Sequence, residues 1–538
     1  MTTTAHSSTN NSWPAYSILA AGATVVVADG ILYVASRLVG RPTPGSPSAL
    51  VLAVQGGYRP TMPVLVLAAC LLLLLIAAGV AVSMWWMARP SHGKSSTRAR
   101  WATRKDLAPL VVSKNPLSRV GRIGLGQTDP GGRWLAAEPL HSVCVLGPSR
   151  SGKTLSVVIP ALREWDGPSI CTSVKADVLK ATETKRAKIG PVLVYDPTNS
   201  TGRTSATWNP LASCTTWPDA WEMASWLVDA SAPSGSDRTD FWTSQGRMLL
   251  APLLFAAGTG GLGMADVVRW VQLQEVKDIE KLLKGQGVVE ASNAFAACQK
   301  MPANTRGSVY ATAISILEVY TDPAVAASAD GCDISPARLL DTNATLYLVS
   351  PVHAQHRLAP LIEALIMSIV REAQDRAQAG NPCDPGLLLL LDEAGNVAPL
   401  RHLPAIASTG RGQGIQLLSV WQDLGQIKHR YGQLAGTVLT NHAGLLAFRG
   451  IRDLETLDLL SRLLGDADVD RISTTQQAGG GQSTSRSSQQ ERLAPIDELR
   501  QLPVGSGLLI YGALPPVKVR FPLARKARTS QPWRRARD

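Results

Sequence analysis

Eight consecutive residues have the types and spacing that bind phosphate: Gly147-Pro148-Ser149-Arg150-Ser151-Gly152-Lys153-Thr154. They fit the pattern G-x-x-x-x-G-K-[ST], between an apolar run (141–146) that predicts a strand and a segment (155–165) that predicts a helix. Backbone N–H groups from Gly147 to Leu155 would surround a phosphate at the helix start. Lys153 would reach the β- and γ-phosphates of a nucleoside triphosphate, and the Thr154 hydroxyl would ligate Mg²⁺. The alternative is an ordinary Gly/Ser turn that contains a lysine.

Such a loop needs an acid to hold the metal, and the run Leu387–Leu391 ends in one. An apolar strand followed by Asp392 and Glu393 is the Walker B pattern. Asp392 would orient Mg²⁺, and Glu393 would polarise the attacking water as a general base. Taken alone, the run has an alternative interpretation as a core strand that ends in a solvated acid pair. Together with the phosphate-binding loop, it indicates nucleotide hydrolysis.

Two further side chains are candidates for sensing or completing this site. Gln422 follows the next predicted strand, where a polar residue would sense the γ-phosphate, although a structural amide is the alternative. Arg411 lies in the Gly-rich segment 408–414 and would act in trans as an arginine finger in a ring. An ordinary surface arginine is the alternative there, and Arg449 is a second choice for the finger.

The remainder of the body predicts an α/β fold with a parallel sheet. Apolar runs rich in Leu and Val alternate with helical patterns, and the strands are expected at 142–146, 169–174, 192–195, 345–350, 387–391, 415–420, 445–448 and 507–511. Helical pattern alone occupies the middle, which predicts an all-helical domain (216–330) inserted into a nucleotide-binding domain (107–215 and 331–514). The Gly/Ser/Gln-rich stretch 478–490 predicts a flexible loop.

Composition limits the class of protein. The 538 residues carry a net charge of +12, which favours anionic partners such as nucleic acid, nucleotide or lipid. The seven cysteines are scattered singly, so they indicate neither a zinc site nor a disulfide framework. The simplest interpretation is a reduced cytoplasmic body.

The first 88 residues predict a membrane anchor. Two apolar runs, about 15–36 and 64–84, are each long enough to span a bilayer as a helix, and a short external loop would join them. The basic segment 89–106 follows without an intervening acid until Asp106, which places that flank and the N-terminal residues 1–14 in the cytoplasm. A second basic segment, 515–538, predicts a disordered C-terminal tail.

With these residues in place the chain resembles the type IV secretion coupling proteins, the TraG/TraD-like ATPases of conjugation. The order of short motifs along the chain carries the resemblance: Gly147–Thr154, Ile159-Pro160, Val174-Lys175, Tyr195-Asp196-Pro197, Trp208-Asn209-Pro210-Leu211, Phe241-Trp242, Leu391-Asp392-Glu393, Trp421-Gln422-Asp423-Leu424, Gln426, Tyr431-Gly432 and Pro495–Arg500. The chain departs from the family at Lys175-Ala176-Asp177, where a Lys-Gly-Glu type sequence is commoner, and that leaves a contact role for Lys175 in doubt.

The resemblance implies a RecA-like P-loop domain that uses ATP and Mg²⁺, a membrane anchor in the inner (plasma) membrane and assembly into a homo-hexamer. It implies a motor that couples a relaxase–DNA complex, or a protein, to a type IV secretion channel. The DNA would be single-stranded and held without sequence preference. The inserted helical domain would select the substrate.

Two alternatives stay open on the sequence. One is a double-stranded DNA translocase of the FtsK/HerA type, against which only the two spans and the helical insertion argue. The other is a membrane adaptor that binds nucleotide without hydrolysing it and recruits cargo. Intact Lys153, Asp392 and Glu393 argue against the adaptor.

Overall fold

The computed structural model describes residues 30, 31, 33–40, 61–88, 99–113, 121–231, 237–398, 400–476 and 482–521. The chain forms two compact units, residues 1–97 and 98–538. In the first unit, helix α3 spans Met62–Ala88 and contains the second predicted span, whereas most of the first lies outside the described residues. No helix within the described ranges combines the length and apolar character that crossing a membrane requires.

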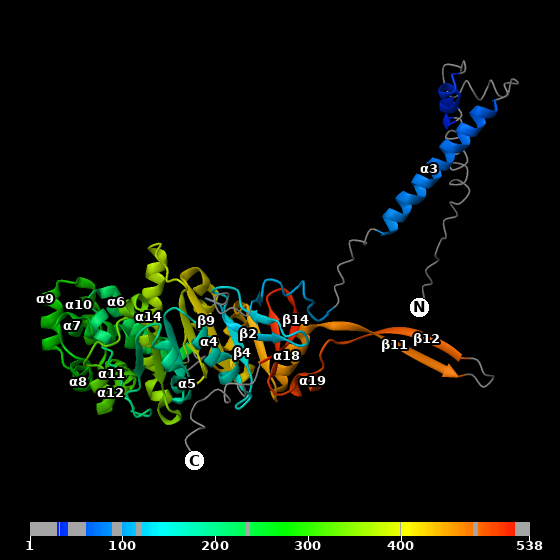
Figure 1. The fold of residues 1–538 in the computed structure, drawn as a ribbon. Helices are drawn as coiled ribbons and strands as arrows, with labels where there is room; N and C mark the ends of the chain where they lie inside the picture. The colour runs from blue at the N-terminus through cyan, green and yellow to red at the C-terminus, as the bar shows by residue number, and fades with distance from the viewer. Residues whose placement is uncertain are drawn as a thin grey trace, which may run out of the picture. The chain divides into compact units, whose positions relative to one another are not determined.

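The second unit is built on a large sheet whose central part is parallel (Figure 1). Seven parallel strands lie in the order β10 (Gly444–Phe448), β4 (Val143–Leu146), β9 (Ile415–Trp421), β8 (Leu387–Leu391), β5 (Ser169–Ser173), β7 (Thr345–Val349) and β6 (Val192–Tyr195). These are seven of the eight runs that the sequence marked as strands, so the predicted α/β fold with a parallel sheet is confirmed.

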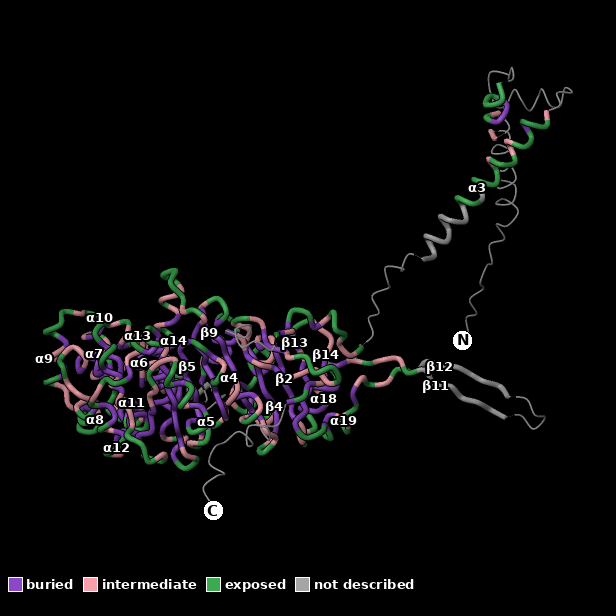
Figure 2. Tube along the Cα trace, viewed as in Figure 1, coloured by how far each residue is buried: buried purple, intermediate pink, exposed green. Residues whose placement is uncertain are grey.

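The leucines of β8 show why this pattern forms a central strand. Leu387, Leu389 and Leu391 join the apolar core on one face of the sheet, and Leu388 and Leu390 join the core on the other. All five are fully buried. Figure 2 shows that buried residues make up most of the labelled central strands of the sheet. Since successive side chains of a strand point to opposite faces, an unbroken leucine run fits a strand that is covered on both sides.

An antiparallel extension continues the sheet beyond β10. Its strands lie in the order β13 (Ser506–Tyr511), β14 (Leu514–Arg520), β2 (Gly124–Thr128), β3 (Trp134–Ala136) and β1 (Val111–Val112). Strand β14 corrects the prediction that a disordered tail begins at 515. Val517 and Val519 are buried and alternate with the outward-pointing basic residues Lys518 and Arg520. This alternation is typical of a strand, but the many basic residues of the segment obscured it in the sequence. Residues 522–538 lie outside the described residues.

The predicted flexible loop at 478–490 is also wrong over most of its length. Strands β11 (Asp466–Gln476) and β12 (Gln482–Arg492) form a two-stranded antiparallel sheet in continuous register from Asp466↔Arg492 to Gln476↔Gln482. The backbone N–H and C=O groups of the two strands pair with each other whatever the side chains are. The Ser/Gln-rich composition therefore gave no sign of these strands. The residues between the two strands, 477–481, lie outside the described residues.

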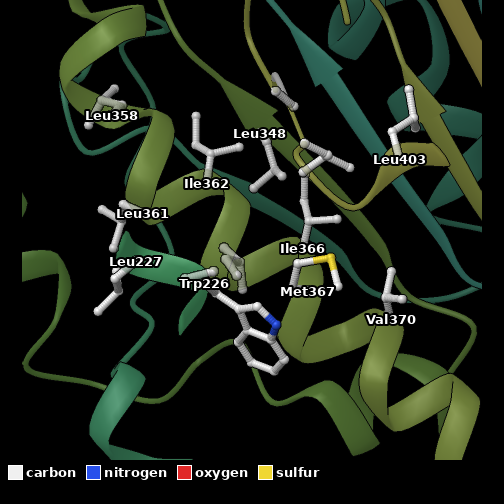
Figure 3. Packing of buried hydrophobic residues seen from close by; sticks show 14 of the residues in the cluster. Trp226, Leu227, Leu348, Leu358, Leu361, Ile362, Ile366, Met367, Val370 and Leu403 are labelled. Carbon is white, nitrogen blue, oxygen red and sulfur yellow. The ribbon is translucent and has the colours of Figure 1, made fainter. Parts of the chain in front are cut away.

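Helices fill the long connection between β6 and β7. They are η3 (Pro210–Ser213), α6 (Trp217–Ser231), α7 (Asp237–Thr259), α8 (Met264–Leu273), α9 (Lys277–Gln286), α10 (Val289–Gln299), α11 (Ala303–Leu317), η4 (Glu318–Thr321), α12 (Pro323–Ser328) and α13 (Pro336–Asp341). Figure 3 shows Trp226 and Leu227 of α6 beside Leu361 and Ile362 of α14 (Gln355–Gln378). Because α14 also packs on Leu348 of β7, the inserted helices share one apolar core with the sheet.

A buried arginine joins α5 (Asp177–Arg186) to the amino edge of the sheet. The Arg186 side chain is fully buried. Its Nε donates to Thr345 Oγ1 at 2.6 Å, Nη2 donates to Gly167 O at 2.7 Å, and Nη1 donates to Trp165 O. The planar guanidinium thus satisfies three acceptors at once, which no other side chain can do in the same space.

A second buried charge joins helices on the other face. Glu363 of α14 is fully buried, and its Oε1 accepts a hydrogen bond from Arg401 N at 2.7 Å. Arg430 of α16 (Leu424–Tyr431) approaches Oε2 at 3.8 Å, and Asp229 of α6 interacts with His402 at 3.5 Å nearby. Burial raises the pKa of Glu363 to about 7, against the lowering effects of the Arg401 hydrogen bond and the Arg430 charge.

We expect Arg186→Met to lower the free energy of unfolding by about 2–4 kcal/mol, because three buried acceptors lose their donor. Thermal unfolding followed by circular dichroism measures the loss. Lys185→Met is the matched control, since it removes one positive charge from an exposed position of the same helix. Equal melting temperatures for the two variants would contradict this account of Arg186.

We expect Glu363→Gln to flatten the pH dependence of stability between about pH 5 and 7.5. The folded-state pKa of Glu363 is raised, so the folded state binds more protons than the unfolded state in this range, and stability falls as pH rises through about 7. Glutamine keeps the acceptor for Arg401 N and cannot ionise. Melting temperatures at pH 5.5 and 7.5 test this, and identical pH slopes in parent and variant would count against it.

Candidate functional site

The phosphate-binding loop begins where β4 ends. Gly147 N donates to Trp421 O of the neighbouring β9 at 3.2 Å, which fixes the start of the loop to the sheet. A Cβ on Gly147 would lie 2.9 Å from Phe448 Cβ, so the close packing with β10 excludes any other residue. Arg150 and Gly152 both have positive φ, 64° and 98°, which curves the loop tightly. The helix that follows begins as a π-helical turn, η2 (Thr154–Val158), and continues as α4 (Ile159–Glu164).

Lys153 is folded back against its own loop. Its Nζ donates to Gly147 O and to Pro148 O, the latter at 3.0 Å, and the side chain is buried. Burial lowers the pKa of Lys153, whereas the nearby Glu393 and Asp392 charges raise it. The ammonium group is therefore held inside the loop, where an incoming phosphate would replace carbonyl oxygens as its partner.

A second observation also indicates that the loop can bind phosphate. Ser151 Oγ is buried and has no hydrogen-bond partner among the described residues. A buried hydroxyl without a partner is costly, and a bound phosphate oxygen would satisfy it. The donors of Ser151 and Lys153, together with backbone N–H groups, make a set that suits the phosphates of a nucleotide.

The metal-binding candidates lie together although they are far apart in sequence. Thr154 Oγ1 donates to Asp392 Oδ2 at 3.2 Å, and Thr172 Oγ1 of β5 supports Asp392 by donating to its carbonyl oxygen at 3.0 Å. Burial raises the pKa of Asp392 to about 6, and the neighbouring Glu393 charge adds to this effect. A divalent cation between the Thr154 hydroxyl and the Asp392 carboxylate would offset that unfavourable negative charge.

Glu393 has an unusual backbone and two amide partners. Its φ is 55°, a left-handed conformation that a glutamate adopts only where its surroundings enforce it. Gln422 Nε2 donates to Glu393 Oε2 at 3.3 Å, and Asn396 Nδ2 donates to the same oxygen at 3.4 Å. The structure thus brings the predicted general base and the predicted sensor together.

Three contributors to this site were not singled out as site residues by the sequence. Gln426 Oε1 accepts from Gln422 N at 2.9 Å and so holds the sensor loop. Asn396 follows Glu393 by a single turn, and Thr172 supports Asp392 from an adjacent strand. Gln426 carries a motif signal, whereas no sequence pattern marks Thr172 or Asn396.

Arg411 does not approach the phosphate-binding loop of its own chain. It lies on η6 (Gly410–Gln413), which precedes β9. Burial lowers the pKa of His141 and the Arg411 charge adds to this, whereas burial raises the pKa of Tyr511 and the Arg411 charge opposes that rise; both residues lie at the amino edge of the parallel strands. The loop lies at the opposite, carboxyl edge. Arg411 is exposed, as an arginine that serves a neighbouring subunit must be. Arg449, the second choice, instead follows β10 at the carboxyl edge, beside the loop.

The known proteins that are similar to this chain indicate one family. A family described as "Type IV secretory system Conjugative DNA transfer" matches residues 100–523. The conjugal transfer protein TraG of Escherichia coli is 27% identical over 417 residues, which cover 69% of this chain and 64% of TraG. Protein VirD4 of Rhizobium radiobacter is 23% identical over 399 residues, 71% of this chain and 56% of VirD4. The chain thus spans less than two thirds of the length of these two relatives.

Solved structures show the same fold. The bacterial conjugative coupling protein TrwB, unbound, has a TM-score of 0.57 at 20% identity over 71% of this chain and 84% of that one. The plasmid coupling protein TrwB in complex with ADP and Mg²⁺ has a TM-score of 0.56 at 20% identity, covering 71% and 85%.

The family match extends from just before the first strand of the large sheet to just beyond its last, so it includes the phosphate-binding loop, Asp392, Glu393 and the inserted helices. This chain belongs to the family of type IV secretory system proteins for conjugative DNA transfer.

Proposed function

We propose that this chain is an ATPase that couples a relaxase–DNA or protein substrate to a type IV secretion channel and drives its transfer. The main observation behind this proposal is that four side chains lie close together at the carboxyl edge of the sheet. Thr154 contacts Asp392 at 3.2 Å and Gln422 contacts Glu393 at 3.3 Å, across 238 and 29 positions of sequence. Membership of the conjugative transfer family supports the substrate class.

Each residue has a defined task in this proposal. The loop amides, Ser151 and Lys153 bind and orient the phosphates of ATP. Thr154 and Asp392 would hold Mg²⁺, and the bound metal would supply positive charge that offsets the charge of the phosphate oxygens. Glu393 accepts the proton of the attacking water, and Gln422 positions that carboxylate relative to the γ-phosphate.

The remaining parts of the proposal concern location and assembly. The apolar runs 15–36 and 64–84 would attach the chain to the cell membrane, with both termini and the ATPase body in the cytoplasm. Residues 107–215 and 331–514 would form the RecA-like domain of a homo-hexamer, and the inserted helices (216–330) would select substrate. The position of Arg411 at the edge remote from its own nucleotide site supports a role in trans.

We expect Lys153→Ala and Glu393→Gln each to lower ATP turnover by at least about 100-fold, because one loses phosphate binding and the other loses the general base. Turnover is measured by phosphate release from the purified full chain. Lys180→Ala is the control, since Lys180 is an exposed lysine on α5. Glu393→Gln should still bind ATP, whereas Lys153→Ala should bind it weakly.

The same assay distinguishes the alternatives. If the parent protein hydrolyses no ATP at any protein or DNA concentration, it is an adaptor rather than a motor. Stimulation by duplex DNA alone would favour a double-stranded DNA translocase. Conjugative DNA transfer that survives Lys153→Ala in cells would contradict an essential coupling ATPase.

We expect subunits with Arg411→Ala and subunits with Lys153→Ala to recover turnover when they are mixed. Each variant alone would be inactive, but in a mixed ring an intact Arg411 can face an intact phosphate-binding loop across a subunit interface. Phosphate release is measured as the ratio of the two variants changes. Turnover that never exceeds that of either variant alone would show that Arg411 does not act in trans.

A further inference from the structure

A large polar cavity opens beside the proposed catalytic carboxylate. Its volume is about 780 Å³, and it lies between the inserted helices and the carboxyl edge of the sheet. One wall comes from α6, α11 and η4 of the insertion. The other comes from η5 (Val352–Ala354), the start of α14, the segment after β8, and α16. Crevices outside the carboxyl ends of parallel strands are the usual place for ligands in α/β proteins.

The cavity is lined by cationic and imidazole side chains. Arg357 and Arg430 lie in its wall with His353, His356 and His429, and Glu318 is the only acid among the described lining residues. Arg357 also pairs with Asp322 at 2.8 Å, and Arg430 approaches Glu363 at 3.8 Å. Each guanidinium group has five N–H donors, so these ion pairs leave donors over, and planar guanidinium donors suit phosphate oxygens.

The lining also indicates how such a ligand would be held. No Phe, Tyr or Trp occurs among the described lining residues, so the cavity offers no aromatic surface on which bases could stack. Contacts would therefore fall on the backbone phosphates and would carry no sequence information. The cavity is too small to enclose a duplex, and a short stretch of one strand fits it better.

One residue of the cavity wall contacts the proposed catalytic carboxylate directly, and a second is connected to it through Gln422. Asn396 lines the cavity and donates to Glu393 Oε2 at 3.4 Å. Gln426 lines it as well, and its Oε1 accepts from the backbone of Gln422, whose side chain donates to that same Glu393 oxygen. The Asn396 amide thus links one carboxylate oxygen of the proposed general base to the cavity wall.

We propose that this cavity binds the phosphodiester backbone of a single-stranded nucleic acid, and that Asn396 and Gln426 transmit its occupancy to Glu393. The inference rests on the proposed ATPase function. When phosphates occupy the cavity, they compete with Glu393 Oε2 for the amide donor of Asn396. The Glu393 carboxylate then loses this partner but keeps Gln422, which orients it toward the attacking water. Asn396 and Gln426 are thus positioning residues, which act on hydrolysis through Glu393.

The binding step is tested with the full chain and a fluorescent oligo-dT probe, by anisotropy in the absence of nucleotide. We expect the double substitution His353→Glu/His356→Glu to weaken binding about tenfold or more at low salt, because two carboxylates would repel the phosphates. Both side chains are exposed, so folding should survive, and a melting curve checks it. Lys284→Glu changes the net charge by the same two units on the exposed surface of α9 and should bind as the parent does.

The coupling step is tested by ATP turnover with and without oligo-dT. We expect Asn396→Ala to lose no more than a few-fold of the oligo-dT affinity, because the arginine and histidine side chains supply most of the phosphate contacts, yet to show a DNA-free turnover close to its DNA-bound turnover. The ratio of these two rates is the readout, since a merely structural defect would lower both.

Several results would overturn the inference. If the double variant bound oligo-dT as tightly as the parent protein, the cavity would not be the binding site. Tighter binding of poly-Glu or duplex DNA than of oligo-dT would also contradict the inference. An unchanged stimulation ratio in Asn396→Ala would remove the link to Glu393. Because anisotropy needs no hydrolysis, these failures are distinguishable from a failure of the ATPase function itself, which would appear as an inactive parent protein.

Discussion

The burial of β8 on both faces is the constraint on which the site depends. Five leucines fix this strand between β9 and β5, and the chain must leave the sheet at Asp392. Two acids therefore emerge side by side at a rigid edge, and Glu393 takes a left-handed backbone conformation to turn away from the strand. A loop that moved freely could not hold two like charges at one place with different partners.

That position carries an electrostatic cost which the ligand would relieve. Burial and the Glu393 charge raise the pKa of Asp392 to about 6, and burial lowers the pKa of Lys153. Both groups are thus less easily charged than in water, and Ser151 Oγ has no partner in the described structure. A nucleotide with its metal would satisfy all three at once. The contacts within the site itself leave these groups poorly stabilised, and a bound nucleotide with its metal would stabilise them.

The sequence predicted the parallel strands well and the rest of the sheet poorly, for physical reasons. β6 and β8 were predicted with their observed bounds because buried parallel strands are short, unbroken apolar runs. β2 is rich in glycine, β1 has two residues, and β14 contains two prolines and two basic residues, so none shows such a run. The P-loop residues form a local pattern that a sequence can show. The contacts of Asn396, Thr172 and Arg186 join distant elements, and no local pattern encodes them.

The helical insertion has a physical reason to lie where it does. A P-loop site at a sheet edge can bind and hydrolyse nucleotide without any insertion, so the helices between β6 and β7 serve another purpose. Their α6 packs on α14, whose first turn faces the cavity and whose Glu363 contacts the segment following Glu393. Any displacement of α6 must therefore act on the elements around the catalytic carboxylate, because close-packed cores transmit strain instead of absorbing it. In the proposed function, a substrate bound by the insertion and a water bound by Glu393 would be linked by one continuous set of packed contacts.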